Sequence, residues 1–210
     1  MITAAPKCSA STRLASPPRH RDASSASAED REAFTSFPKE YFTIEKVAGV
    51  QIAFRAIQPE DEPLLVEFHK TVSDQSVHFR YFGGISLRER TLHERLRRHC
   101  AIDYSREFAL LADWKNASGA HEILGVARLF KEPTRDEAEF AILIADSWQG
   151  KGLGTCLLKL LVSLGRESQL RQINGRILAG NLAMLHVSQK AGFSLRFNAL
   201  AGEWLAELSF

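Results

Sequence analysis

The sequence has few cysteines, no long apolar run and almost no net charge, and each absence excludes a class of protein. Cys8, Cys100 and Cys156 are an odd number at unrelated spacings, so they form neither a disulfide framework nor a zinc pattern. Such thiols suit a reducing compartment, and we expect a cytoplasmic protein. No apolar run approaches the roughly 18 residues of a transmembrane helix. A formal net charge of +2 does not indicate a polyanionic partner. We therefore expect neither a membrane nor a nucleic-acid partner.

Glycine is absent from residues 1–38, which hold four of the seven prolines and many Ser and Ala residues. This composition, without apolar periodicity, predicts a disordered tail, because the segment has too little apolar surface to bury to offset the conformational entropy that ordering would cost. The first 21 residues carry four basic residues and no acid, so an organelle transit peptide is the alternative. The remaining pattern predicts one domain over residues 41–210.

Residues 41–210 alternate between strand-like and helix-like patterns and predict a mixed α/β domain. The expected order is β-α-α-β-β-β-α-β-α-β-β. The predicted strands cover residues 51–57, 107–114, 122–130, 137–145, 173–178, 193–197 and 203–209. The predicted helices cover residues 59–70, 76–100 (with a break before 87), 153–164 and 181–190.

The stretch DSWQGKGLGTCLL, residues 146–158, places Gly150, Gly152 and Gly154 between a predicted strand and a leucine-striped helix. Free backbone N–H groups and the helix dipole make such a corner an anion site, and glycines let a phosphate approach closely. Thr155 stands where a P-loop requires its second glycine and where a dinucleotide loop requires its third, so neither motif fits. A glycine-rich strand-to-helix corner without a ligand is the simpler alternative.

The pattern that fits is [Q/R]-x-x-G-x-[G/A], which Gln149, Gly152 and Gly154 satisfy. It resembles the pyrophosphate loop of GNAT-superfamily N-acetyltransferases, which holds coenzyme A. A second element, NLAMLHVSQKAGF from Asn181 to Phe193, resembles the superfamily's N-x-x-A…GF segment. That likeness implies that the Asn181 amide binds the pantetheine arm, although asparagine also favours the N-cap of a helix.

The likeness extends to one group within the superfamily, the C-terminal acetyltransferase domain of Pat-type protein lysine acetyltransferases. Five stretches carry it: RAIQPEDEPLLVEFHKTVSDQSVHFRYF, LRERTLHERLRRHCAIDYSREFALLA, ILGVARLF, AEFAILIADSWQGKGLG and GNLAMLHVSQKAGF. The resemblance implies the GNAT acyl-CoA N-acyltransferase fold and acetyl-CoA as co-substrate. The expected cofactor-binding residues are Ile142, Leu143 and Ile144 through their backbone, then Gln149, Gly150, Lys151, Gly152, Leu153, Gly154, Thr155 and Asn181.

Acetyl transfer to lysine requires a neutral amine, and we expect a carboxylate to accept its proton. The resemblance implies Glu139 as this general base, on the strand that leads to the glycine loop. Glu137 shares its strand face and is the runner-up. Many relatives carry a tyrosine seven residues after the asparagine as the general acid for the CoA thiolate. Here that position is Ser188, a poor acid, so the general acid stays unassigned.

Two further patterns suggest other functions, and neither fits well. The histidines of HERLRRH, His93 and His99, lie six apart rather than at the i, i+4 spacing of a zinc helix, so we expect no metal site. The arginines of residues 88–98 are interleaved with Glu89 and Glu94, which predicts an ion-paired, solvated face rather than a nucleic-acid site. Cys156, within the leucine-striped helix, is expected to be a buried structural thiol.

The sequence thus predicts an enzyme that transfers acetyl from acetyl-CoA directly to a lysine of a protein. By resemblance an acyl-CoA synthetase is the expected substrate. An acetyltransferase for a small amine or a protein N-terminus stays open, as does a CoA-binding sensor without turnover. The acyl chain length, the target lysine and the oligomeric state do not follow from the sequence.

Overall fold

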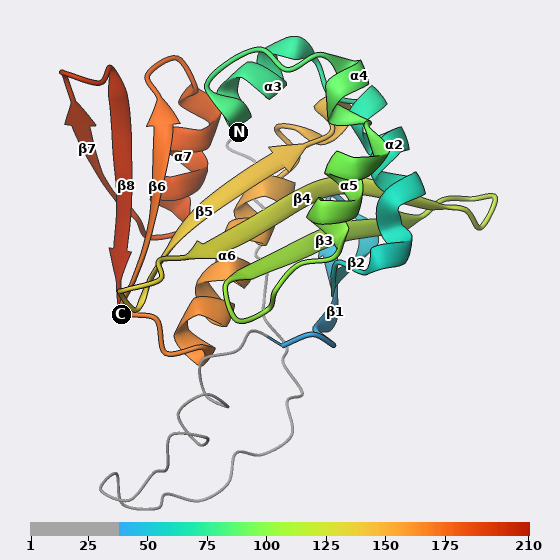
Figure 1. Cartoon of the computed structure of the whole chain (residues 1–210), viewed down its shortest axis with the longest axis horizontal. Helices are drawn as coiled ribbons and strands as arrows, with labels where there is room; N and C mark the ends of the chain where they lie inside the picture. The colour runs from blue at the N-terminus through green and yellow to red at the C-terminus, as the bar shows by residue number, and fades with distance from the viewer. Residues whose placement is uncertain (1–37) are drawn as a thin grey trace, which may run out of the picture.

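A computed structural model describes residues 38–210, coloured from blue to red in Figure 1. Its strands are β1 Phe42–Val47, β2 Val50–Ala56, β3 Glu107–Lys115, β4 His121–Lys131, β5 Glu137–Ile144, β6 Gln172–Leu178, β7 Ser194–Asn198 and β8 Glu203–Ser209. Its helices are η1 Pro59–Asp61, α2 Glu62–Lys70, α3 Asp74–Tyr81, α4 Leu87–Arg90, α5 His93–Cys100, η2 Asp146–Trp148, α6 Leu153–Glu167 and α7 Leu182–Lys190. The predicted tail lies outside the described residues except for Pro38, and the domain limits stay a prediction.

The eight strands form one mixed sheet in the order β1-β2-β3-β4-β5-β6-β8-β7. Neighbouring strands are antiparallel, except that β5 and β6 run parallel. Alternate residues of a strand face opposite sides, and β3 buries both sides. Phe108 and Leu110 pack in the cluster that contains the α6 leucines, whereas Ala109 and Leu111 pack with residues of α2 and α5. The sheet therefore lies between α6 on one face and α2 to α5 on the other (Figure 1).

The parallel pairing of β5 with β6 is short, and this creates the space for a site. Only three residue pairs align, from Glu137 with Gln172 to Glu139 with Asn174. Beyond Glu139, β5 continues to Ile144 and pairs with β4 alone among the described strands. The two strands diverge there in Figure 1. A strand edge with open backbone groups thus lies inside the sheet rather than at its margin.

Phe140 occupies the point where the two strands separate. A Cβ on Gly175 of β6 would lie 2.4 Å from the Phe140 ring, so only glycine lets the ring rest against that strand. The ring also meets Phe193 edge-on, with 5.1 Å between centroids. This aromatic contact fills the base of the gap between β5 and β6.

The mixed α/β class and the leucine-striped helix are confirmed, and one expectation on secondary structure is corrected. Leu153, Leu157, Leu161 and Leu164 are fully buried, as their helical spacing predicts. The pattern predicts one strand before the first helix, but the structure has two, because β1 forms a hairpin with β2. The hairpin turn uses positive φ at Ala48 and Gly49, the geometry that suits a tight turn between twisted strands.

The arginine-rich segment also differs from its expectation. Within residues 38–210, no ion pair joins Glu89 or Glu94 to its arginines. Glu89 instead forms a capping box with Ser86 at the start of α4, a short helix that ends at Arg90. Arg90 is buried and lies 3.9 Å from Asp74, and the Arg95 guanidinium lies 5.5 Å from the Tyr81 ring. Part of the segment's charge therefore faces the protein rather than solvent.

No helix among the described residues is long and apolar enough to cross a membrane.

Candidate active site

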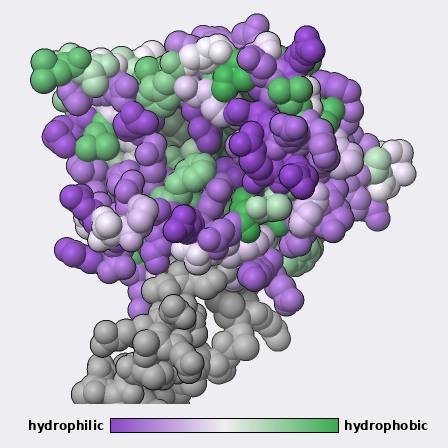
Figure 2. Space-filling model, viewed as in Figure 1, coloured by the Kyte–Doolittle hydropathy of each residue, from purple (hydrophilic) through white to green (hydrophobic). Residues whose placement is uncertain are grey.

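A cleft of about 320 Å³ lies where β5 and β6 separate. Figure 2 shows a mostly hydrophilic face with hydrophobic surface between its two halves, where β5 lies in Figure 1. The cleft brings together most of the residues that the sequence predicts for the site: Glu139, Ile142, Leu143, Ile144, Gln149, Gly150, Gly152, Gly154, Thr155 and Asn181. Two predicted residues do not line it. The Leu153 side chain is fully buried, and the Lys151 ammonium lies 5.0 Å from the Trp148 ring centroid.

The glycine loop has a backbone conformation that residues with a side chain rarely adopt, and no atom of the described residues beyond the adjoining ones lies within 4 Å of a Cβ built on Gly150 or Gly152. Gly150 and Gly152 have φ of +72° and +89°, in the left-handed region that favours glycine. Gly152 is the N-cap of the 15-residue helix α6 and, lacking a side chain, makes no side-chain capping bond to the first turn. The unbonded N–H groups of that turn and the helix dipole favour an anion at this end. Gly154 and Thr155 line the cleft from the same turn, so this geometry suits a phosphate group.

A polar network ties the loop to α3. Asp146 accepts hydrogen bonds from the Ser76 hydroxyl at 2.8 Å and from the Ser73 amide at 3.1 Å. The Gln149 side-chain amide donates to Ser76, to Asp146 and to the carbonyl of Ile144, at 2.9, 3.0 and 3.2 Å. Gln149 is thus a tether of the loop, and its bond occupies the carbonyl of Ile144. The sequence analysis missed Ser76 and Asp146, since nothing local connects positions 70 residues apart.

Glu139 and Glu137 share a strand face but have different surroundings. Glu139 lines the cleft, and its Oε1 lies 3.8 Å from Nε of Arg176 on β6. Glu137 lies outside the cleft lining and pairs with Arg135 at 3.8 Å. The Arg176 guanidinium also stacks over Phe82, 5.3 Å from the ring centroid. Of the two carboxylates, only Glu139 therefore reaches the point where the sheet opens.

Arg80 is a further residue of the cleft that the sequence analysis did not single out. It belongs to α3, lines the cleft, and lies 4.9 Å from the Tyr81 ring. Burial lowers the pKa of its guanidinium from the usual value, because a cation loses hydration there. Glu139 opposes this shift through its negative charge. Two arginines, Arg80 and Arg176, therefore line the cleft together with the Glu139 carboxylate.

Asn181 caps the last helix, α7, and lines the cleft, whereas Ser188 lies within that helix and does not line the cleft. The Asn181 side-chain oxygen accepts from the Met184 amide at 3.1 Å, so it caps α7 while lining the cleft. This cap leaves the amide N–H₂ of Asn181 for another partner. Ser188 is fully buried, is absent from the cleft lining, and its hydroxyl has no hydrogen-bond partner among the described residues. Its position gives the serine no access to a leaving thiolate.

Cys100, Cys156 and the histidines of the HERLRRH segment do not line the cleft. Cys156 is buried in α6. Burial raises the pKa of the Cys100 thiol to about 11, which keeps it protonated. His93 is exposed and lies 2.6 Å from Glu62, whereas His99 faces a small pocket beside the cleft. Residues 38–210 contain no group of three or more His, Cys, Asp or Glu side chains that could hold a metal ion.

Comparison with known proteins assigns the family. A family model described as an acetyltransferase (GNAT) domain matches residues 51–194. The chain is 28% identical over 145 residues to an acetyltransferase of Pseudomonas aeruginosa, covering 69% of this chain and 76% of that protein. It is 28% identical over 116 residues to acetyltransferase Pat of Mycolicibacterium smegmatis, covering 54% of this chain but only 33% of Pat.

Solved structures show the same fold. The GNAT domain of S. lividans PAT superposes with a TM-score of 0.72 at 24% identity, covering 83% of this chain and 99% of that one. RimJ of Mycobacterium smegmatis, solved in complex with CoA-disulfide, gives a TM-score of 0.59 at 15% identity, covering 80% and 86%. The separated parallel strands and the glycine corner thus define an acyl-CoA acyltransferase fold. This chain belongs to the GNAT acetyltransferase family.

Proposed function

We propose that this protein transfers the acetyl group of acetyl-CoA to a lysine side chain of another protein, in one direct step within a ternary complex. The single observation that carries the proposal is the position of Glu139. It lies at the last paired residues of β5 and β6, beside the open strand edge, and lines the same cleft as the glycine corner. An amine acceptor and a thioester donor meet at one carboxylate in that arrangement.

The open edge of β5 and the corner at α6 provide the donor site in this proposal. The pantetheine arm pairs with the backbone of Ile142 to Ile144, on the side that β6 leaves vacant, and the Asn181 amide adds a contact. The pyrophosphate lies against residues 150–155, at the free N–H groups of the first turn of α6. Gln149 acts indirectly, by holding the loop to Ser76.

Glu139 acts as general base. A free lysine has a pKa near 10.4, so deprotonation at pH 7 costs about 4.6 kcal/mol. A positioned carboxylate accepts that proton directly or through one water, and the neutral amine then attacks the thioester carbon. The C–S bond breaks as the tetrahedral intermediate collapses, and CoA leaves as a thiolate whose ordinary pKa near 8.5 makes departure feasible at neutral pH. Because Ser188 is buried, the proton for that thiolate comes from water or from the substrate nitrogen, which carries a surplus proton in the tetrahedral intermediate and loses it as the amide forms.

Support for a protein acceptor comes from the Pat-type stretches of the sequence and from the likeness to Pat. The proposed substrate is an acyl-CoA synthetase, and the proposed compartment is the cytoplasm, as the cysteine content suggests. In this proposal the acceptor approaches the part of the cleft that Arg80 and Arg176 line.

The test is CoA release from acetyl-CoA, measured as free thiol with three kinds of acceptor. These are a purified acyl-CoA synthetase, a panel of small amines, and peptides with a free N-terminus but no lysine. The proposal predicts that the synthetase is acetylated on lysine with the highest kcat/KM. Turnover only with small amines or N-termini would overturn the protein-lysine assignment. Binding of acetyl-CoA without turnover on any acceptor would indicate a sensor.

A further inference from the structure

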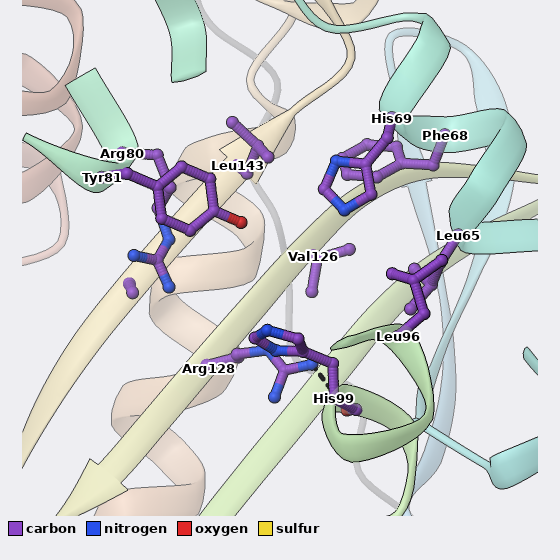
Figure 3. A pocket seen from close by; sticks show the side chains of 11 residues that line it. Leu65, Phe68, His69, Arg80, Tyr81, Leu96, His99, Val126, Arg128 and Leu143 are labelled. Carbon is purple, nitrogen blue, oxygen red and sulfur yellow. Dashed lines mark hydrogen bonds between the residues drawn. The ribbon is translucent and has the colours of Figure 1, made fainter. Parts of the chain in front are cut away.

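A second, smaller pocket of about 30 Å³ adjoins the cleft (Figure 3). Arg80, Ala141 and Leu143 line both spaces, so the two share a wall. Glu139 and Ala141 project from the same face of β5, because alternate strand residues share a side. Two strand residues span about 7 Å. The part of the pocket wall at Ala141 therefore lies about that far along β5 from Glu139, which carries the carboxylate that we propose as the base.

Each polar side chain around this pocket can donate a hydrogen bond, and two of them are arginine cations. Its polar lining residues are His69, Arg80, Tyr81, His99 and Arg128, and none of the lining residues is Asp or Glu. Figure 3 shows the Tyr81 hydroxyl and the His69 ring projecting from opposite sides toward the space between them. Arg128 is already satisfied, since it pairs with Glu107 and donates to the His99 carbonyl at 2.7 Å. Among the described residues, no carboxylate lies within 4.0 Å of Arg80.

The histidines are held neutral, and one is unsatisfied. His69 is 7% exposed, and its Nδ1 has no hydrogen-bond partner among the described residues. Burial, reinforced by nearby arginines, lowers the pKa of His69 to about 4 and that of His99 to about 3. Each neutral imidazole still carries one N–H donor. A buried polar atom without a partner costs free energy, which a suitable ligand would recover.

We propose that this pocket binds a carboxylate of the acceptor, on an aspartate or glutamate close to the target lysine. This inference rests on the proposed function, in which the acceptor is a protein. A space of about 30 Å³ has room for one or two waters, or for the oxygens of one carboxylate in their place. Arg80 supplies the charge, and the Tyr81 hydroxyl supplies a further donor. The same site would accept the carboxylate of a small amino acid, so the test separates the two sources.

The experiment uses lysine peptides with a single aspartate at each of the three positions on either side of the lysine, each matched with its asparagine counterpart. The full-length protein should acetylate at least one aspartate peptide with a kcat/KM about 10-fold or more above its partner, since hydrogen bonds to charged groups are strong. Arg80→Gln should reduce this aspartate-to-asparagine ratio to about one. Tyr81→Phe, which keeps the ring contacts with Arg80 and Arg95, should reduce it partly. Arg97→Gln removes an exposed charge of α5 outside the pocket and should keep the ratio.

A small-molecule pair makes the result independent of the protein-acceptor proposal. Nα-acetyl-lysine and its amide differ only in the carboxylate. If no peptide is acetylated but the acid is preferred over the amide in an Arg80-dependent way, the pocket assignment stands and the proposed function fails. Equal kcat/KM within every peptide pair and within this pair would overturn the carboxylate pocket. Inhibition by chloride or phosphate that needs Arg80, without any aspartate preference, would also overturn it, because the pocket would then serve inorganic ions only.

Discussion

Replacing Gly154 by valine should abolish acetyl-CoA binding while the protein still folds. Gly154 lies in the first turn of α6, its φ is outside the left-handed region, and an added Cβ would lie 3.6 Å from Val187, an ordinary contact. The fold therefore accepts a side chain there, and a helix interior gains about 1 kcal/mol when glycine becomes alanine. The valine methyls, however, occupy the cleft mouth where we place the pyrophosphate.

The size of the effect follows from the contacts that are lost. A hydrogen bond from a backbone N–H to a charged phosphate contributes about 1.5–3 kcal/mol, so each one lost weakens Kd roughly 10- to 150-fold. Losing two of them puts the affinity beyond ordinary titration. Gly154→Ala, with one methyl, should be intermediate in affinity and at least as heat-stable as the parent. Gly152 is a poorer choice, because its φ of +89° strains any other residue and confounds binding with folding.

Calorimetric titration with acetyl-CoA, together with a melting curve without ligand, measures both quantities. Lys159→Val is the matched control, since Lys159 is an exposed residue of α6 outside the cleft lining. It should bind acetyl-CoA like the parent. A folded Gly154→Val protein with parental affinity would refute the placement of the pyrophosphate at this corner.

Three other predictions concern stability and the tether of the loop. Arg55 pairs with two buried carboxylates, Asp61 at 2.6 Å and Asp113 at 2.8 Å. Arg55→Met should therefore lower the free energy of unfolding by about 3–5 kcal/mol in a denaturant titration. The control Lys70→Met, which removes an exposed ion pair, should change it by less than about 1 kcal/mol. Asp146→Ala should weaken acetyl-CoA binding about 10-fold or more by calorimetry, because the loop loses its link to α3; unchanged affinity would show that the network is dispensable. The pKa of His69 is lowered from 6.5 to about 4, so its neutral form contributes stability above pH 6.5 that is lost as the pH falls toward 4. The melting temperature of His69→Gln should therefore decline less over that range than that of the parent, and parallel curves would contradict this sign.

The parts of the site that sequence could predict are those encoded locally. The glycine corner combines a strand, three glycines and a leucine stripe within residues 137–164, and each of these patterns has a direct steric or periodic meaning. The buried leucines of α6 and the N-cap at Asn181 followed from the same kind of spacing. Strand β1 was missed, although its alternation is visible, because its half-exposed edge position weakens the pattern.

The acceptor side could not be predicted because its residues come together only in the folded chain. Arg80 on α3 and Arg176 on β6 are 96 positions apart, and nothing local distinguishes either from a surface arginine. The smaller pocket of about 30 Å³ combines His69 from α2, His99 from α5 and Arg128 from β4. The interleaved charges of residues 88–98 predicted ion pairs along one helix, but the segment is divided between α4, which ends at Arg90, and α5, which begins at His93, and Arg90 is buried. The spacing of charges along the chain therefore does not predict which side chains pair with one another or become buried in the fold.

The most direct test of the account is the turnover of Glu139→Gln beside that of Glu137→Gln, with acetyl-CoA affinity measured on the same preparations. Glutamine keeps the shape of the side chain and its hydrogen bonding to water but cannot accept the proton. Base catalysis contributes about 10²- to 10⁴-fold, so kcat of Glu139→Gln should fall by that order at pH 7 with Kd for acetyl-CoA little changed. Glu137→Gln should turn over like the parent, because Glu137 lies outside the cleft lining. A crippled Glu137→Gln beside an active Glu139→Gln would move the base to Glu137, and parental turnover of both variants would contradict a carboxylate base altogether.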